Sequence, residues 1–118
     1  MKEKRQHPRI AKILPIKLSD SDKEFDVLTE TKNVSESGAY CWVNRPLELM
    51  TKLNVVILLP LRKNKKKVIG KINCCGVVVR LEHIDDTSQH PYRVAIFFSE
   101  IKDSDKKLLL SYIKPFVQ

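Results

Sequence analysis

The chain has few of the residues that build metal centres. Its 118 residues include only three cysteines and three histidines, and none of them shows CxxC, HxxH or HxH spacing. Cys74 and Cys75 are adjacent, so on a strand their side chains point to opposite faces and are poorly placed to hold one ion. We therefore expect no metal site, and we expect all three cysteines to be buried, reduced thiols.

A long apolar run is also missing. The longest, at residues 53–61, is interrupted by Asn54 and Pro60 and is far shorter than the roughly 20 residues that a membrane-spanning helix needs. The first residues carry charges where a signal peptide needs an apolar stretch. These features predict a cytoplasmic protein without a transmembrane segment.

What is present is a globular composition with an uneven distribution of charge. With 42% hydrophobic and 31% charged residues, the chain fits one domain with one core. Its formal net charge of +8 comes from residues 1–12 and from the run at 62–67, which holds five of the positive charges. We interpret that run as a solvated hairpin tip. A contact with nucleic acid, a membrane or an acidic partner is the alternative.

Strand patterns dominate the chain. Apolar or alternating runs at residues 10–18, 25–31, 38–43, 53–59, 77–81 and 92–98 predict strands separated by segments of turn composition. The runs at 53–59 and 77–81 are nearly continuous, as expected where both faces of a strand are covered. Only the end indicates a helix, with Asp103 or Ser104 as cap and Pro115 as the stop. The pattern predicts an all-β protein, a small antiparallel barrel with a C-terminal α-helix.

Two short motifs carry the functional signal. Residues 5–9, Arg-Gln-His-Pro-Arg, place two guanidiniums on a short arm, where they can pair with phosphates or stack on a base. Residues 33–38, Asn-Val-Ser-Glu-Ser-Gly, supply an amide, a hydroxyl and a glycine that allows backbone to approach a ligand closely. Together the motifs have the chemistry of an anion clamp.

RxxxR followed by [D/N]xSxxG resembles the PilZ family, whose usual ligand is the bacterial second messenger cyclic di-GMP. The likeness extends over residues 4–116 and includes the segments 76–80 and 92–98. It implies a six-stranded antiparallel β-barrel within a single domain at residues 1–118. Residues 1–9 would be a flexible ligand-binding arm, 10–99 the barrel and 103–116 the C-terminal helix.

The resemblance implies a binding role for five residues. Arg5 and Arg9 would hold the phosphates and guanine bases of cyclic di-GMP, by pairing with phosphate, with the O6 and N7 edge of guanine, or with its ring face. Asn33, Ser35 and Gly38 would form the floor on the barrel surface. In the structural alternative the arginines belong to a disordered basic tail, Asn33 and Ser35 bond their own backbone, and Gly38 serves a left-handed turn.

Four further residues could add to the ligand surface: Lys4, Ser37, Arg80 and Arg93. Lys4 stands where the family often has another arginine, and it keeps the charge without the planar fork. Ala95 stands where many members have glycine, and we expect that difference to affect packing only.

The resemblance implies a receptor without a cofactor. Its arm would fold over cyclic di-GMP and present a changed surface to an unidentified protein partner, with the oligomeric state left open. The alternative is a small β-barrel that binds single-stranded nucleic acid through the basic hairpin tip. It is disfavoured because the aromatic pair on one strand face, Tyr40 and Trp42, lies away from the lysine run. We expect no enzymatic activity, because no nucleophile, base and orienting residue can be proposed together.

Overall fold

The computed structural model describes residues 8–20, 26–84 and 89–117. The described part contains six strands, one α-helix and one 3-10 turn. They are β1 (Pro15–Asp20), β2 (Asp26–Val34), β3 (Gly38–Val43), β4 (Lys52–Lys63), β5 (Lys66–His83), β6 (Tyr92–Ile101), α1 (Asp103–Ile113) and η1 (Lys114–Phe116).

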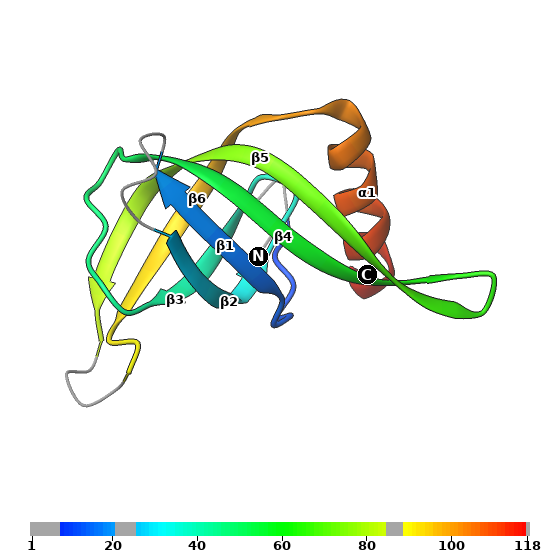
Figure 1. Cartoon of the computed structure of the whole chain (residues 1–118), viewed down its shortest axis with the longest axis horizontal. Helices are drawn as coiled ribbons and strands as arrows, with labels where there is room; N and C mark the ends of the chain where they lie inside the picture. Colours follow the sequence, from blue (N-terminus) through cyan, green and yellow to red (C-terminus); the bar gives the residue numbers. More distant parts are fainter. Residues whose placement is uncertain (1–7, 21–25, 85–88, 118) are drawn as a thin grey trace, which may run out of the picture.

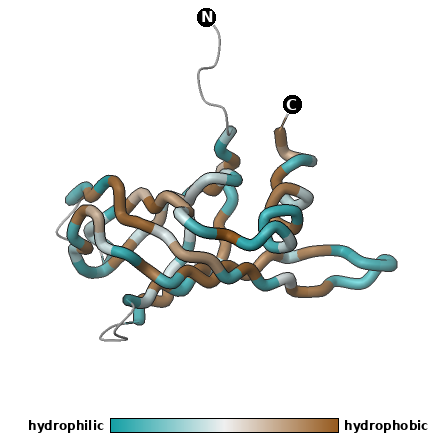
Figure 2. Tube along the Cα trace, turned by 90° about the horizontal axis from the view of Figure 1, so that it is seen from above, coloured by the Kyte–Doolittle hydropathy of each residue, from teal (hydrophilic) through white to brown (hydrophobic). Residues whose placement is uncertain are grey.

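The strands form a closed ring in the order β1-β2-β3-β6-β5-β4, and every neighbouring pair is antiparallel (Figure 1). The prediction of six antiparallel strands followed by a C-terminal helix is confirmed. The ring is uneven, because β4 and β5 have 12 and 18 residues whereas β1 and β3 have six each. The paired ends of β4 and β5 therefore extend well beyond the ring, as Figures 1 and 2 show from two directions.

The hydrophobic core lies inside the ring, because alternate residues of each strand point inward. Along β4, for example, Leu53, Val55, Ile57 and Leu59 are buried. Helix α1 covers one end of the core with buried residues that include Leu109.

The outer face of β4 and β5 is open to solvent. Leu58 is 36% exposed and Val79 is 52% exposed. The expectation that these strands are covered on both faces is wrong, and their continuous apolar runs leave hydrophobic side chains on the surface.

Residues 10–14 are not part of a strand, although the sequence predicted one from residue 10. Strand β1 begins at Pro15, which has no N–H to donate and suits the first position of a strand. The preceding residues are tied to β2 instead. Ile10 forms a β-bridge to that strand. The Thr31 hydroxyl accepts a hydrogen bond from the Leu14 N–H at 3.0 Å and donates one to the Lys12 carbonyl at 2.7 Å. Residues 10–14 are therefore anchored beside the second motif.

The lysine run is the tip of the β4–β5 hairpin, as predicted. Asn64 and Lys65 form its turn, with φ angles of 53° and 65°. Positive φ at both central residues is the pattern of a two-residue type I′ turn, whose twist matches that of paired strands. The pairing continues without a shift up to Lys63 opposite Lys66, so the tip is a regular extension of the sheet.

Helix α1 ends at Ile113, before Pro115, in agreement with the predicted stop. Its N-terminus differs from the prediction. The cap is Lys102, without a side-chain hydrogen bond, and Asp103 lies in the first turn, where its charge favours the helix dipole. None of the helices in the described ranges has the length and apolarity needed to traverse a bilayer.

The three cysteines are free thiols in different environments. Cys41 is buried, Cys74 is half-buried and Cys75 is exposed. The prediction of buried thiols is therefore confirmed for Cys41 and wrong for Cys75, because neighbouring residues on β5 face opposite sides. Burial raises the pKa of both Cys41 and Cys74 to about 12.

Candidate functional site

The turn between β2 and β3 is built from the second motif. The Ser35 N–H donates to the Gly38 carbonyl at 2.8 Å, and the Ser37 N–H donates to the Ser35 hydroxyl at 3.2 Å. Ser35 therefore bonds its own turn, as the structural alternative predicted, and it is only 3% exposed. The Ser37 hydroxyl lies 3.2 Å from that of Ser35. Each hydroxyl has one proton and two lone pairs, so the pair keeps hydrogen-bonding capacity for a further partner.

Gly38 is required by the close approach of β6. A Cβ atom at this position would lie 2.2 Å from the Ile96 carbonyl oxygen and 3.3 Å from its carbonyl carbon. None of the described glycines has a positive φ, so the left-handed-turn interpretation of Gly38 is wrong. The missing side chain lets the motif lie directly against the last strand.

A small cavity of about 100 Å³ joins the first motif to the second. Arg9 contributes from the arm, and Ser35, Ser37 and Gly38 contribute from the turn. The full lining is Arg9, Ser35, Ser37, Gly38, Ala39, Val79, Ala95, Ile96 and Phe97. Four of the residues singled out from the sequence thus meet around one space. Arg5 and Lys4 lie outside the described residues.

The motifs and their arrangement agree with the comparison with known families. The model described as the PilZ domain matches residues 3–114. The chain belongs to the PilZ domain family. PilZ is a ligand-binding regulatory domain, not a catalytic one.

Three solved structures share the fold of this PilZ domain. The inhibitor of motility MotI/DgrA of Bacillus subtilis superposes with a TM-score of 0.77 at 22% identity, over 97% of this chain and 51% of that chain. The PilZ domain of CeSA from a cellulose-synthesizing bacterium has a TM-score of 0.61 at 14% identity, over 92% of this chain and 97% of that chain. The PilZ domain of YcgR from Escherichia coli, solved with cyclic di-GMP, has a TM-score of 0.63 at 10% identity, over 97% of this chain and 95% of that chain.

The chain therefore spans about half the length of MotI/DgrA. At these identities the likeness shows the fold alone. The comparison with curated proteins gave no match.

Asn33 of this PilZ domain lies on β2 opposite Tyr40 of β3. Its side-chain oxygen Oδ1 is buried and has no hydrogen-bond partner within the described structure. Leaving a buried acceptor unpaired costs about 1–3 kcal/mol, so the native state gains if a ligand donates to it. The turn-only interpretation does not account for this side chain.

Strand β6 contributes residues that the sequence did not single out as ligand contacts. Phe97 lies opposite Gly38 and is 51% exposed. Ala95 lines the same cavity, so the residue that stands where many family members have glycine lies at the candidate site. The alternation of the last strand could have indicated that both residues share a face, but only the register shows that this face adjoins the turn.

Arg80 and Arg93 lie on the neighbouring strands β5 and β6, but in different surroundings. Arg80 is exposed and lies opposite Ala95. Arg93 packs on Trp42, with its guanidinium carbon 4.3 Å from the ring centroid. Its Nε atom is buried and has no hydrogen-bond partner within the described residues. Sequence reasoning did not predict this stacking.

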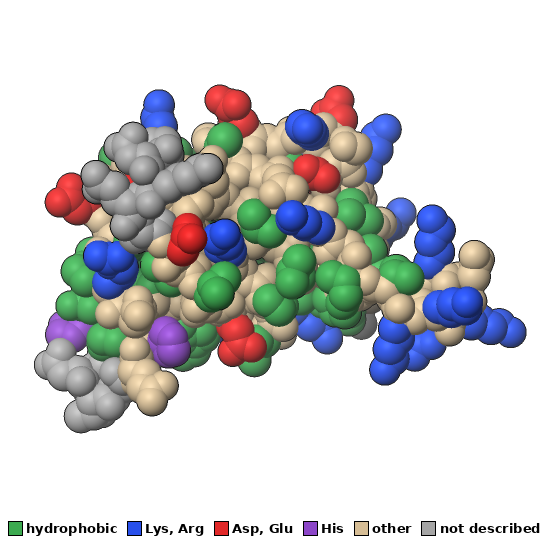
Figure 3. Space-filling model, in the orientation of Figure 1, with side chains coloured by type: hydrophobic (Ala, Val, Ile, Leu, Met, Phe, Trp, Pro, Cys, Tyr) green, Lys and Arg blue, Asp and Glu red, His purple; other side chains and the backbone are tan. Residues whose placement is uncertain are grey.

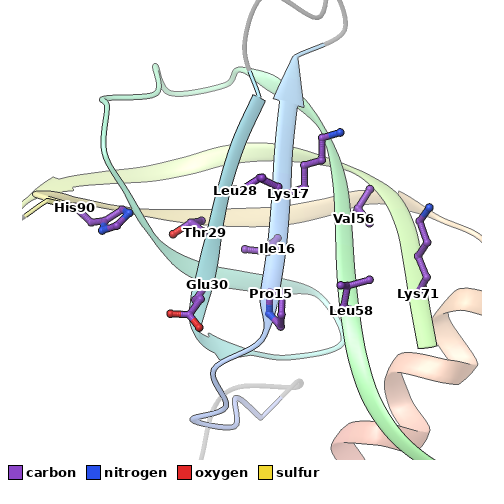
Figure 4. Close-up of a pocket in the computed structure, with 10 residues that line it drawn as sticks. All are labelled: Pro15, Ile16, Lys17, Leu28, Thr29, Glu30, Val56, Leu58, Lys71 and His90. Atoms are coloured by element: carbon purple, nitrogen blue, oxygen red, sulfur yellow. The ribbon is translucent and has the colours of Figure 1, made fainter. Parts of the chain in front are cut away.

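A wider cavity of about 670 Å³ lies on the outer face of β1, β2 and β4 (Figure 4). Its walls include Leu28, Leu58, Lys17 and Lys71, and none of the residues singled out from the sequence lines it. Figure 3 shows hydrophobic side chains interspersed with lysines or arginines on this side of the molecule. The face is a mixed sheet surface, separate from both PilZ motifs.

Proposed function

We propose that this PilZ domain is a cyclic di-GMP receptor that regulates a protein partner and has no catalytic activity. The observation that carries the proposal is the cavity in which Arg9 of the first motif meets Ser35, Ser37 and Gly38 of the second. The E. coli YcgR domain, which has the same fold, was solved with this nucleotide. We also take the closed ring of strands to be the β-barrel of the family fold, which acts as the rigid platform for the ligand.

In this proposal each polar group of the arm and of the second motif has one task. Arg9 is exposed and always charged, so its guanidinium pairs with a phosphate or with the O6 and N7 edge of a guanine. The unpaired Asn33 Oδ1 accepts a hydrogen bond from a guanine N–H. The two serine hydroxyls bind phosphate oxygens. Arg5 and Lys4 add positive charge from the remainder of the arm, residues 1–9.

In this proposal the arm folds over the nucleotide, and the partner recognises the resulting change in the surface beside the C-terminal helix. A cavity of about 360 Å³ lies between the arm and the helix. It is lined by Pro8 of the arm, by Glu36 of the turn and by residues of α1 and η1, including Ile113. Lys12 lies over the Phe116 ring, 4.1 Å from its centroid. An arm that moves onto the nucleotide therefore alters the surface beside the helix, where Phe116 is 45% exposed.

The basic hairpin tip does not favour the nucleic-acid alternative. Binding of single-stranded nucleic acid uses aromatic side chains as stacking platforms among the cations. The sequence has no Phe, Trp or Tyr between Trp42 and Tyr92, so the whole β4–β5 hairpin lacks such a platform.

Titration calorimetry with cyclic di-GMP tests the proposal. The wild-type protein should bind it in preference to a single-stranded oligonucleotide. Arg9→Ala should weaken binding by about 2 kcal/mol or more, because a charge-assisted contact is lost. Arg62→Ala removes the same charge at the hairpin tip and should leave the affinity unchanged. Equal affinity in wild type and Arg9→Ala would refute the assignment of the clamp.

A further inference from the structure

The β4–β5 hairpin carries positive charge that its own strands do not offset. The sequence has no Asp or Glu between Glu48 and Glu82. In the same interval it has eight Lys or Arg residues: Lys52, Arg62, Lys63, Lys65, Lys66, Lys67, Lys71 and Arg80. The ladders from β4 to β1 and from β5 to β6 stop at Ile57 and Cys74, so the six cations at 62–71 lie on the part that extends beyond the ring (Figures 1 and 2).

The tip concentrates this charge at a cost in stability. The register places Arg62 opposite Lys67 and Lys63 opposite Lys66, and like charges directly opposite one another destabilise a pair of strands. Lys65 has a φ of 65° at the second position of the turn, where glycine is favoured because it has no Cβ. Local conflicts of this kind are expected at functional sites. A negatively charged surface would relieve the repulsion.

The outer face of the hairpin places apolar side chains between its cations. The cross-strand pairs of this face, in order from the tip, are Arg62 with Lys67, Pro60 with Ile69, and Leu58 with Lys71. At roughly 3.3 Å per residue the three rows extend over about 13 Å. Ile69 is 67% exposed. Leu58 and Lys71 also line the wider cavity on β1, β2 and β4 (Figure 4), so the face continues onto the ring.

We propose that this hairpin docks on the surface of an anionic phospholipid bilayer, with Ile69 at the boundary between headgroups and acyl chains. The inference is independent of the nucleotide site. Binding to a membrane surface combines buried apolar area with attraction between cations and anionic lipids, and the hairpin supplies both. The acidic residues Asp26 and Glu30 belong to β2, which β1 separates from β4.

Three features favour a bilayer over an acidic protein. Five of the six cations at 62–71 are lysines, which lack the rigid fork by which arginine grips a carboxylate but suit headgroups that rearrange around a point charge. Lys63 and Lys66 lie on the opposite face of the hairpin from Arg62 and Lys67, so the tip is charged all round, whereas a protein partner would cover one side. The hairpin also lacks the aromatic residues that anchor most protein interfaces.

Co-sedimentation with vesicles, without added nucleotide, tests the proposal. Wild-type protein should sediment with vesicles made of equal parts of phosphatidylglycerol and phosphatidylcholine, and should stay in solution with phosphatidylcholine alone. Serine at Lys63, Lys65 and Lys66 should weaken binding to the anionic vesicles about a hundredfold, because each cation near an anionic surface contributes about fivefold.

A second triple variant controls for net charge. Serine at Lys102, Lys106 and Lys107 removes the same charge from the N-terminal end of α1. Its affinity for the anionic vesicles should stay within about threefold of wild type, because salt screens charges over about 8 Å. Far-UV circular dichroism confirms that each variant is folded.

The apolar part of the contact has its own matched pair of variants. Ile69→Ser keeps the charge of the hairpin and should weaken binding severalfold, because less apolar area enters the bilayer. Ile84→Ser changes the same residue type at the other end of β5, where Ile84 is 45% exposed. It should bind as wild type does.

Three results would overturn the proposal. The first is equal sedimentation with both vesicle compositions, because the cations would then give no selectivity. The second is full binding by Ile69→Ser or by the triple serine variant of the tip. The third is binding to polyglutamate but to neither kind of vesicle, which would assign the hairpin to an acidic protein. Since no nucleotide is present, the receptor function stands or falls separately.

Discussion

Replacing Gly38 by alanine should separate β3 from β6. The new Cβ would lie 2.2 Å from the Ile96 carbonyl oxygen, whereas ordinary contacts begin at 3.4 Å. The obstacle is backbone within a paired strand and cannot rotate away. The required shift disturbs two hydrogen bonds of 2.8 Å, from the Ser35 N–H to the Gly38 carbonyl and from the Phe98 N–H to the Ser37 carbonyl.

The expected loss of unfolding free energy is about 2–4 kcal/mol. Each weakened hydrogen bond contributes about 1 kcal/mol, and overpacking adds about 1–3 kcal/mol. These losses are partly offset, because alanine loses less chain entropy on folding than glycine. Within a strand this difference raises the unfolding free energy by about 0.5–1 kcal/mol. Urea unfolding, followed by Trp42 emission and circular dichroism, measures the difference.

Gly70→Ala is the matched control for this substitution. Its Cβ would lie 2.6 Å from Leu61 Cδ1 and 3.3 Å from Leu108 Cδ2. Both neighbours are the ends of flexible side chains, so the loss should stay below about 1 kcal/mol. If the two variants lose the same stability, or if Gly38→Ala is as stable as wild type, the argument from the close approach of β6 is wrong.

Three other predictions concern the ligand and the thiols. Serine at Lys63, Lys65 and Lys66 should leave the affinity for cyclic di-GMP within about threefold of wild type, because the hairpin tip is remote from the site and salt screens its charge over about 8 Å; a larger loss in calorimetry would place the ligand at the tip. Cyclic di-AMP should bind at least about tenfold more weakly, since adenine presents a donor where guanine presents O6; equal affinity in a competition titration would mean that the site recognises only an anion. At pH 8 a thiol reagent should modify Cys75 first and spare Cys41, because the raised pKa of Cys41, about 12, keeps its thiol neutral until the pH approaches that value. Equal labelling of the two thiols in mass spectrometry would contradict the burial of Cys41.

The existence of the strands and their order along the chain follow from local patterns, but their lengths do not. Strand β5 was predicted over residues 77–81 and extends over Lys66–His83. Its first part, which includes Lys71 and Asn73, is too polar at alternate positions to indicate a buried strand. It is a strand because each residue pairs with β4 and because the outward face of the hairpin tolerates polar side chains.

The two motifs could be located in the sequence, and the remainder of the cavity could not. Arg9 and Ser35 belong to recognisable ligand-binding patterns, whereas Val79, Ala95 and Phe97 lie in strand segments that carry no such pattern. Their place depends on the register between strands distant in sequence, and on an irregularity between Val78 and Arg80 that leaves both Val79 and Arg80 exposed. Such an irregularity arises from the sheet as a whole.

The closed ring also bears on how the protein folds. Strands β4 and β5 join through a two-residue turn, so their pairing closes a short loop, whereas the β1–β4 pairing brings together Ile16 and Ile57 across two intervening strands. Loop-closure entropy makes contacts of large sequence separation slow to form. The β4–β5 hairpin should therefore form early and the ring close late. Because the proposed site draws on the arm, the β2–β3 turn, β5 and β6, a partly folded chain has no complete site, and a newly made receptor would become sensitive to its signal only when folding is complete.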